Sequence, residues 1–509
     1  MRAVLRRLVL GFLALATLSW PVQATWSIVV VDRRTGEVAV GGATCLANTD
    51  LLELIPAVAV GVGAGCIQSR GDAPALVTLY DGLVRGDVPP VVMEDVKSLW
   101  PNPGAYQVGI VAFRGRPKTF TGGQAGRAAG GVFGQVGDFA YAIQGNVLTG
   151  PSVWLGAEAA LLTTPGDLAT KMMAAMEAAR AAGGDGRCSC DLGRPTSCGD
   201  PPTSFEKSAH CGFLVVARHG DQDSPCVQGP DCASGDYYLK LNIRGRDSRN
   251  NAPDPVLQLQ NRFDAWRTTL VGEPDAILSE VVAVQAVPAD GRTRRTVTIR
   301  LRDVNGEALV AGGDQVRVET EDGGPPLASL TPVTDHGDGS YSFELTAPDA
   351  IGAERLIVTA LANGRRIHLY PYLDVAYEPV APLHVGYREV RASTAPDVPF
   401  LLDVPSAAGQ PYVVLASLSG TSPGTVVGGV PIPLNTDGLT WSTLLRAGDP
   451  NVLPGTIGVL DGLGRAEASL SLRPRQMLYL SGLHLDWAGL VFGGPQAVAT
   501  NPVGFDVVP

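Results

Sequence analysis

The sequence has few of the residues on which familiar hydrolase and metal sites depend. Only six of its 509 residues are histidines, and only His210 and His219 precede residue 270. No H-E-x-x-H metal motif and no G-x-x-x-x-G-K-[ST] phosphate loop occurs, and no G-x-S-x-G nucleophile turn precedes residue 270. Because a Ser–His–Asp triad needs a histidine base, the sequence disfavours such a triad. We expect no metal and no organic cofactor.

The chain also lacks the basic surface that nucleic-acid binding requires. Its formal net charge is −11, and no extended run of Lys or Arg follows the leader. The sequence therefore predicts no nucleic-acid partner. With 45% apolar and 17% charged residues the chain is globular, and its 62 glycines and 39 prolines indicate many turns. A chain of 509 residues is long enough for about three domains.

Residues 1–24 have the pattern of a secretory signal peptide. Three arginines come first, residues 8–18 are apolar, and small residues permit cleavage after Ala24. An uncleaved membrane anchor is the alternative, but the apolar stretch is well short of the ~20 residues that a span needs. We expect an exported protein that is extracellular, periplasmic or on the cell surface, with no stable membrane span after cleavage. Its formal charge would then be −14, because the leader holds three arginines and no acid.

All eight cysteines lie between residues 45 and 232. An even count in an exported protein favours disulfides. The alternative is a zinc site on the C-S-C…C…H-C stretch at 188–211, which is disfavoured because paired C-x-x-C knuckles are missing. We expect Cys45–Cys66 and Cys226–Cys232 bonds, with the other four joined among themselves: Cys188, Cys190, Cys198 and Cys211.

The first region mixes strand and helix patterns. Two sets of strands with helices before, between and after them fit a four-layer arrangement, in which helices cover two packed sheets. The predicted fold class is therefore α+β. Strands are expected at 25–45 (a hairpin), 57–65, 106–123 (a hairpin), 138–146, 211–218 and 237–245, and helices at 72–86, 90–100, 165–184 and 254–270.

After about residue 287 the helical patterns end and short alternating strands take over. Residues 287–377 resemble the immunoglobulin-like β-sandwich modules of bacterial surface proteins, and residues 382–509 have the pattern of a further all-β domain. The D-H-G-D-G stretch at 335–339 favours a tight hairpin over a calcium loop. We expect both modules to serve as spacers or adhesive units.

The scarcity of histidine bases directs attention to Thr25, which cleavage after Ala24 would make the first residue. An N-terminal threonine carries its own base, because the free α-amine has a pKa near ~8 and can accept the hydroxyl proton. One residue would then supply both nucleophile and base. The alternative is that Thr25 is only the small residue that cleavage happens to leave behind.

Three stretches of the first region resemble one known family: residues 25–44, residues 140–154 with their Q-G-N-x-L-x-G run, and residues 178–187 with G-G-D-G-R. They occur in the order found in the bacterial domain of unknown function 1028 family, which is placed with the N-terminal-nucleophile (Ntn) hydrolases. The resemblance spans about residues 25–270 and implies an Ntn-hydrolase-like four-layer αββα sandwich. It implies amide-bond hydrolysis only as a property of the fold class.

The resemblance also implies which residues surround Thr25. It places Gln144 and Asn146 beside it, with Asn146 as the candidate oxyanion stabiliser; alternatively, this stretch only caps the next helix. Asp185 and Arg187 would orient the amine or bind substrate, or else form a buried ion pair that fixes the turn. The Cys-rich insert at 188–206 departs from the family pattern.

The domain plan is therefore a signal peptide at 1–24, an Ntn-hydrolase-like domain at 25–272 with its insert, and β-domains at 287–377 and 382–509. Our main hypothesis is a secreted hydrolase that cleaves a small amide or peptide-like bond through Thr25. The alternative is a non-catalytic extracellular binding or surface protein with the same fold, which makes surface contacts through its β-domains. A metal-dependent enzyme that uses the Cys/His insert is weaker, and homo-oligomerisation is left open.

Overall fold

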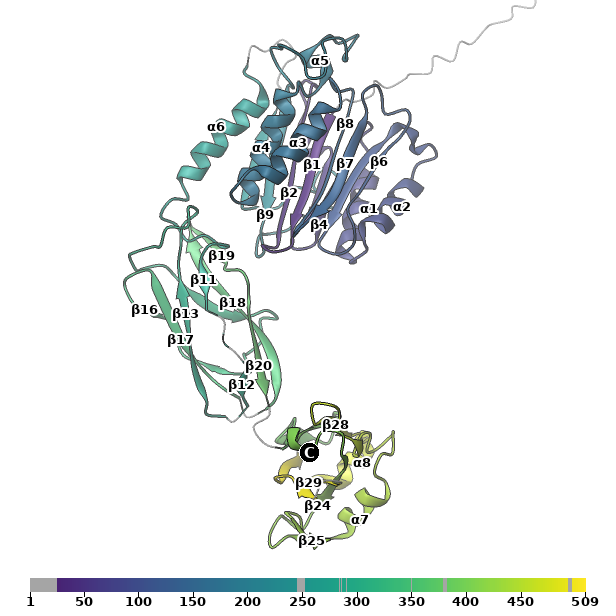
Figure 1. Ribbon diagram of the computed structural model, residues 1–509, viewed down its shortest axis with the longest axis vertical. Helices are drawn as coiled ribbons and strands as arrows, with labels where there is room; N and C mark the ends of the chain where they lie inside the picture. The colour runs from purple at the N-terminus through teal and green to yellow at the C-terminus, as the bar shows by residue number, and fades with distance from the viewer. Residues whose placement is uncertain are drawn as a thin grey trace, which may run out of the picture. The chain divides into compact units, whose positions relative to one another are not determined.

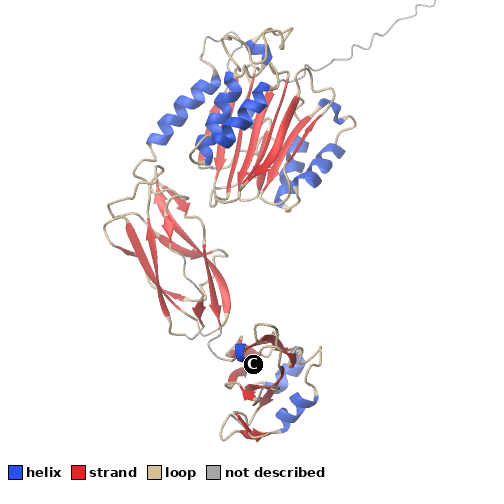
Figure 2. Ribbon diagram, viewed as in Figure 1, coloured by secondary structure: helices blue, strands red, loops and turns tan. Residues whose placement is uncertain are grey.

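The computed structural model describes residues 25–244, 252–282, 284, 286–289, 291–348, 350–378, 382–492 and 497–509. The predicted signal peptide, residues 1–24, lies outside the described residues. The chain divides into two compact units, the first ending at Thr269 and the second beginning at Leu270. Figure 2 shows that the longer helices belong to the first unit, whereas the second consists mainly of strands. The expected order, a mixed α and β region followed by β-rich domains, is confirmed.

Two antiparallel β-sheets form the centre of the first unit. The larger sheet has six strands in the order β10-β9-β2-β1-β8-β7, and the smaller has four in the order β3-β4-β5-β6. The strands are β1 (Thr25–Asp32), β2 (Glu37–Thr44), β3 (Pro56–Ala59), β4 (Gly63–Gln68), β5 (Gln107–Ala112), β6 (Lys118–Thr121), β7 (Gly130–Val136), β8 (Phe139–Asn146), β9 (Cys211–Ala217) and β10 (Leu239–Ile243).

Helices cover the outer face of each sheet (Figure 1). Helices α3, α4 and α6 pack on the larger sheet, and α1 and α2 pack on the smaller one. The layers are held by three apolar clusters, one between the two sheets and one under each helical layer. The helices are α1 (Ala73–Val84), α2 (Pro89–Ser98), α3 (Ser152–Thr163), α4 (Leu168–Ala181), α5 (Gly186–Ser189) and α6 (Pro255–Thr268).

Strand β1 explains how the layers are connected. Its residues are all buried, because alternate side chains enter different cores. Ile28 and Val30 pack under α3 and α4, whereas Val29 and Val31 belong to the cluster between the two sheets. By the same alternation, Thr25 and Ser27 lie on the face that points toward the second sheet.

The sequence patterns failed for several elements of this unit. The single strand expected at 57–65 is a hairpin of β3 and β4, which turns through Gly61 at φ +67°. The turn is hidden in the sequence because Val60 and Val62, the neighbours of that glycine, are apolar. Strand β7 and helix α3 were not predicted. Strand β7 contains three glycines, and α3 is apolar around much of its circumference, so neither shows a clean period.

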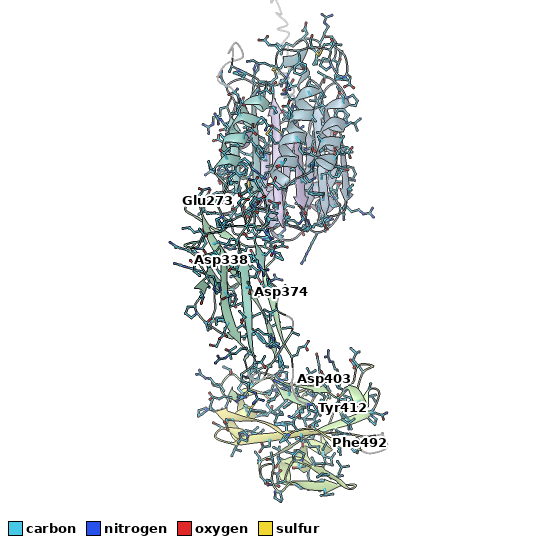
Figure 3. All side chains as sticks on the ribbon, turned by 60° about the vertical axis from the view of Figure 1, so that its left-hand side comes forward. Glu273, Asp338, Asp374, Asp403, Tyr412 and Phe492 are labelled. Atoms are coloured by element: carbon cyan, nitrogen blue, oxygen red, sulfur yellow. A yellow bond between two sulfur atoms is a disulfide. The ribbon has the colours of Figure 1, made fainter. Side chains whose placement is uncertain are left out.

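The second unit begins with a β-sandwich. Two sheets enclose one apolar core, and alternate residues of β17 point into it. On an outer face Arg355 Nε lies 2.7 Å from Asp374 Oδ1 of the neighbouring strand. Figure 3 labels Asp374. The strands are β11 (Glu280–Val281), β12 (Val287–Pro288), β13 (Arg294–Arg300), β14 (Arg317–Thr320), β15 (Ser329–Leu330), β16 (Thr334–Asp335), β17 (Ser340–Thr346), β18 (Gly352–Ala362), β19 (Arg365–His368) and β20 (Leu373–Glu378).

A separate core follows after residue 382, with Trp487 tilted against Phe400 at its centre. The expectation of an all-β domain is wrong in detail, because two short helices occur: α7 (Gly438–Leu445), capped by Asp437, and α8 (Pro474–Met477). The strands are β21 (Leu383–Val385), β22 (Glu389–Arg391), β23 (Val398–Asp403), β24 (Pro411–Ser417), β25 (Thr425–Val427), β26 (Val430–Ile432), β27 (Ile457–Val459), β28 (Arg465–Leu470), β29 (His484–Val491), β30 (Val498–Ala499) and β31 (Val503–Val508).

Six of the eight cysteines form disulfides, and the pairing differs in part from the expectation. The Cys226–Cys232 bond is confirmed, but the Cys45–Cys66 bond is wrong. Cys66 lies inside β4, buried between the sheets, whereas Cys45 lies beyond the end of β2. The observed bonds are Cys45–Cys188, Cys190–Cys198 and Cys226–Cys232, and the buried Cys66 and Cys211 take part in none of these three bonds.

None of the helices in the described ranges is both long enough and apolar enough to cross a membrane.

Candidate functional site

Thr25 lies at one edge of the larger sheet, where β1 begins and its two neighbours, β2 and β8, end. The register of β1 with β8 pairs Thr25 directly with Asn146. The β1–β2 register pairs Trp26 with Ala43, which brings Thr44 to the other side of Thr25. The Thr25 backbone N–H donates to Asn146 Oδ1 at 3.1 Å, and the Thr25 hydroxyl donates to Thr44 Oγ1 at 3.3 Å. The predicted neighbourhood of Thr25 and Asn146 is therefore present.

Asp185 and Arg187 lie next to this group. The Arg187 guanidinium donates to both carboxylate oxygens of Asp185, at 3.1 and 2.8 Å, and also to Thr44 Oγ1 at 3.4 Å. The fully buried Asp185 carboxylate accepts two further N–H groups, those of Arg187 and Cys45. A buried charge of this kind is tolerated because it is paired and hydrogen-bonded. The Thr44 hydroxyl thus connects the ion pair to Thr25.

Gln144 lies farther along the strand than the resemblance implied. Its partner in the register is Ser27, and its side-chain amide donates to the Ser27 hydroxyl at 2.7 Å. This amide lies against Gly109 of β5, where a Cβ atom would collide with it. Gln144 therefore contributes to the polar contact between the two sheets, and the structure shows no direct hydrogen bond between its side chain and Thr25.

Two buried glutamines that the sequence reasoning missed support Thr25 from the second sheet. Gln68, the last residue of β4, donates to the Thr25 carbonyl at 2.9 Å and to Gln107 Oε1 at 2.8 Å. Gln107, at the start of β5, donates to the Gly145 carbonyl at 2.9 Å. The only sequence signal for either residue is a polar side chain at the end of an apolar strand. Thr44 was also missed, although the hairpin register alone places it opposite Thr25.

Two residues near Thr25 adopt a backbone conformation that side chains usually avoid. Ser69 directly follows Gln68 and has φ +70°, and Val147 directly follows Asn146 and has φ +54°. A β-branched residue at positive φ is rare, and strained residues of this kind collect at functional sites. The Val147 peptide is held by bonds from its N–H to the Arg127 carbonyl and from the Gly186 N–H to its own carbonyl.

The group as a whole is enclosed. Thr25 is 1% exposed, and Thr44, Asn146 and Asp185 are fully buried. Arg187 is the most accessible member, with 12% of its side chain exposed. A hydroxyl group, a peptide nitrogen held by a side-chain amide oxygen and a paired cation thus lie together in buried surroundings. In such surroundings polar interactions act more strongly than in water.

The Cys-rich insert is anchored beside this buried group of residues. The Cys45–Cys188 disulfide ties its start to the end of β2, and Cys190–Cys198 closes it internally. Its Asp200 accepts the Ser152 backbone N–H and hydroxyl at the first turn of α3. The insert is therefore joined both to the sheet and to a helix.

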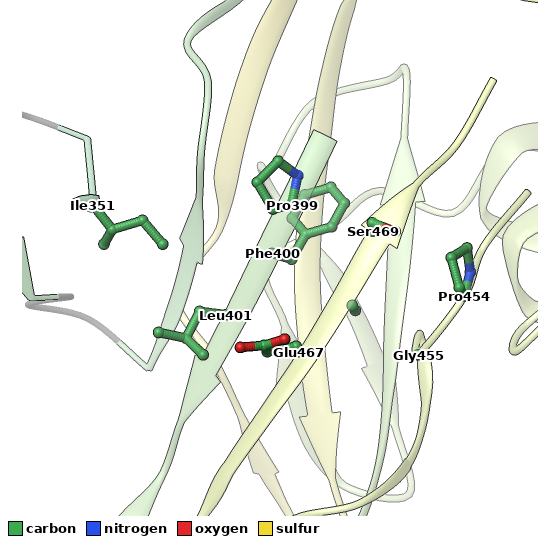
Figure 4. Close-up of a pocket in the computed structure, with 9 residues that line it drawn as sticks. Ile351, Pro399, Phe400, Leu401, Pro454, Gly455, Glu467 and Ser469 are labelled. Carbon is green, nitrogen blue, oxygen red and sulfur yellow. The ribbon is translucent and has the colours of Figure 1, made fainter. Parts of the chain in front are cut away.

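The second unit shows no comparable cluster within its described residues. A hollow of about 410 Å³ in this unit is lined largely by apolar side chains of β23 and β28, with Glu467 as its one carboxylate (Figure 4). The single G-x-S-x-G stretch, residues 420–424, lies in a loop between β24 and β25 and leads into no helix, as a nucleophile turn would require. The 335–339 stretch is a hairpin turn, in which Asp335 and Asp338 accept backbone N–H groups.

Comparison with known sequences confirms the expected resemblances. Residues 25–192 match the family of unknown function DUF1028, and residues 275–374 match invasin domain 3. Each match covers less than half of the chain. No curated protein matches the chain.

Comparison with solved structures gives distant likenesses. A DUF1028 protein of Silicibacter pomeroyi is 17% identical, with 48% of this chain and 88% of that chain covered and a TM-score of 0.34. The Yersinia pseudotuberculosis adhesin InvE is 16% identical, with 46% and 60% covered and a TM-score of 0.19. Invasin, a bacterial integrin-binding protein, is 10% identical, with 95% and 60% covered and a TM-score of 0.21. The chain thus spans about three fifths of the length of these two adhesin structures.

Proposed function

We propose that the protein is exported and acts outside the cell or on its surface as a binding protein, with contacts made through its β-domains. The observation that carries this proposal is the match of residues 275–374 to invasin domain 3, in a segment that folds as a β-sandwich. The proposed sandwich spans residues 287–377 and the proposed terminal domain spans residues 382–509. Disulfides in the first unit support an oxidising compartment.

The terminal domain offers a surface suited to such contacts. Trp441 and Leu445 of α7 are 57% and 83% exposed, and Ile457 and Val459 of the adjacent edge strand β27 are also exposed. Gly448, just after α7, lies against Ile457, so helix and strand are neighbours. Several large apolar side chains in one area support an interaction surface, because soluble proteins rarely expose them together without a role.

Binding of the full-length secreted protein to intact cells tests this proposal. Fluorescently labelled protein should bind bacterial or animal cells saturably, and the Trp441→Asp/Leu445→Asp variant should bind less. The matched control is Leu192→Asp in the first unit, where an apolar side chain is 76% exposed, and this variant should bind as the unchanged protein does. Absence of saturable binding to any cell or extracellular-matrix surface would refute the proposal.

We propose an Ntn-hydrolase activity at Thr25 as the second candidate function. The specific observation in its favour is the Thr25–Asn146 contact, at which cleavage after Ala24 would leave a free α-amine facing a carbonyl oxygen. In this proposal the layers of the first unit form an Ntn-type αββα sandwich, and residues 25–272 form the domain. The substrate would be a small molecule or peptide with an amide bond.

The proposed chemistry follows from the contacts. The Thr25 α-amine accepts the hydroxyl proton as the oxygen attacks the amide carbon, and the resulting ammonium then gives this proton to the departing amine as the C–N bond breaks, which leaves an acyl-enzyme. Water attacks the ester, its proton passes through the α-amine to Thr25 Oγ, and the carboxylic acid is released with the hydroxyl restored. Because the Oδ1 atom of Asn146 faces the nitrogen, we assign Asn146 to orienting the amine. The predicted oxyanion role would use the other end of this amide, whose Nδ2 donates to the Ala125 carbonyl here. Asp185 and Arg187 position Thr44 and, through it, the Thr25 hydroxyl.

Two measurements test this second function. The mass of the secreted protein should correspond to a chain that starts at Thr25, and a β-lactone probe should acylate that residue. Thr25→Ser should retain labelling and Thr25→Val should lose it, whereas Thr163→Val, at an exposed helical threonine, should have no effect. A mature chain that starts elsewhere, or labelling that survives Thr25→Val, would contradict the mechanism.

A further inference from the structure

The Cys45–Cys188 disulfide lies beside a histidine. Cys45, Cys188 and His210 each offer one ligand atom, and these three atoms lie within 4.8 Å of one another. Among the described residues, no other three His, Cys, Asp or Glu side chains form such a group. Cys45 directly follows β2, Cys188 belongs to α5, and His210 directly precedes β9. Cys188 and His210 both belong to the C-S-C…C…H-C stretch, whereas Cys45 precedes Cys188 by 143 residues, so no spacing motif indicates the group of three.

Backbone contacts hold these three residues together independently of the disulfide. The His210 N–H donates to the Thr44 carbonyl at 2.8 Å, which places His210 next to the end of β2. The Cys45 N–H donates to Asp185 Oδ2 at 2.7 Å, which holds Cys45 against the turn that leads into α5. Opening the sulfur–sulfur bond would therefore leave the three side chains close to one another.

The arrangement fits the requirements of a zinc ion. Tetrahedral Zn²⁺ with Zn–S bonds of about 2.3 Å places two thiolate sulfurs about 3.8 Å apart. The Cys45 and Cys188 Cα atoms are 5.7 Å apart, so small side-chain rotations suffice to reach that spacing. Two thiolates and an imidazole are ligands that Zn²⁺ favours, and the half-buried position of all three residues leaves a fourth position for water.

We propose that reduction of the Cys45–Cys188 disulfide converts this cluster into a Zn²⁺ site with His210 as the third ligand. A dithiol reductant supplies two electrons and two protons, so that the disulfide becomes two thiols while the reductant becomes a disulfide. Binding of Zn²⁺ then displaces the two thiol protons. The imidazole binds as the neutral base.

The consequence is that the end of β2 stays cross-linked to α5 in both redox states. The disulfide forms this link when oxidised, and the metal forms it when reduced. Arg187 precedes Cys188 by one residue and contacts Thr44, so the link also holds the ion pair next to Thr25. The inference does not depend on whether Thr25 reacts.

Cobalt binding to the full-length protein tests the proposal. After reduction with a phosphine, which ligates these metals weakly, the protein should bind one Co²⁺ with the thiolate charge-transfer and tetrahedral d–d absorption bands, and Zn²⁺ should displace it. The oxidised protein should show neither band. His210→Ala should weaken Co²⁺ binding by roughly tenfold or more. His219→Ala removes the only other histidine of the first unit and should bind as the unchanged protein does.

A second readout separates loss of a ligand from loss of fold. Zn²⁺ should raise the melting temperature of the reduced protein and leave that of the oxidised protein unchanged. His210→Asn should abolish this rise while melting normally when oxidised. The proposal is overturned if the reduced protein shows no tetrahedral Co²⁺ spectrum, if the His210 variants bind as tightly as the unchanged protein, or if oxidation does not prevent binding.

Discussion

The cost of removing the Cys45–Cys188 disulfide can be calculated from the structure. Replacing both cysteines by alanine opens a loop closed over a sequence separation of 143 residues. Loop-closure entropy then predicts a loss of about 5 kcal/mol from the free energy of unfolding of the first unit. For a unit of this size, such a loss corresponds to a decrease in melting temperature of about 10–20 °C.

The Cys190–Cys198 bond provides a matched control. Its cysteines are also half-buried, so the packing lost on replacement by alanine is similar, but it spans only 8 residues. The same relation predicts a loss of about 2.5 kcal/mol for this pair. The difference between the two double variants, about 2.5 kcal/mol, therefore isolates the effect of loop length.

Urea unfolding of the two oxidised double variants and the unchanged protein, followed by circular dichroism, measures both losses. Equal m-values would show that the unfolding transitions expose the same surface. If the two variants lose equal stability, or if the 8-residue pair costs more, the entropic reasoning fails. The link between β2 and α5 would then act through native-state contacts instead.

Three further predictions concern single groups. Burial raises the pKa of the Cys66 thiol to about 12, so this thiol should not react with maleimide at pH 8 until the protein unfolds. Rapid labelling of native protein at Cys66, located by peptide mass mapping, would contradict its burial. The hydrogen bond to Asp506 raises the pKa of His484, a residue with 51% of its side chain exposed, and NMR titration should show a lower pKa in Asp506→Asn. Because the folded pKa is the higher one, this contact stabilises the protein fully below pH ~6.5 and loses its effect as pH rises through the folded pKa. Gly109→Ala should cost about 1–3 kcal/mol in urea unfolding, because the added methyl group collides with the buried Gln144 amide. An unchanged midpoint would show that Gln144 moves aside at no cost.

Patterns along the chain predicted many individual helices and strands. Such patterns carry no information about which elements pack against one another. The hairpin of β1 and β2, helix α4 and the alternating strands of the sandwich follow from local periodicity and turn residues. The hairpin of β3 and β4 was not predicted, because both strands and their turn are apolar and their sequence has the pattern of one continuous strand. Strand β7 contains three glycines, which have no side chain to show the alternation of an edge strand.

The candidate site was predictable only where family resemblance or strand register supplied the geometry. Asn146 was expected near Thr25 from the resemblance, and the register of β1 with β8 brings the two together. Gln68 and Gln107 come from the other sheet, and no local pattern reports which sheet lies opposite. The disulfide partner of Cys45 was predicted wrongly for the same reason, because the pairing depends on which loop packs over the end of β2.

The sequence by itself determined the apolar run at residues 8–18, the acidic charge, the division into a mixed region and β-domains, and the type of residue at position 25. Each of these features depends on composition or on short-range periodicity, and both can be read directly from the sequence. Only the tertiary structure decided that Asn146 lies beside Thr25 on the adjacent strand, and that Cys45 meets Cys188 beside His210. In both cases the residues come from segments more than a hundred residues apart in the sequence. Their proximity arises from packing between these segments, and no local sequence pattern predicts it.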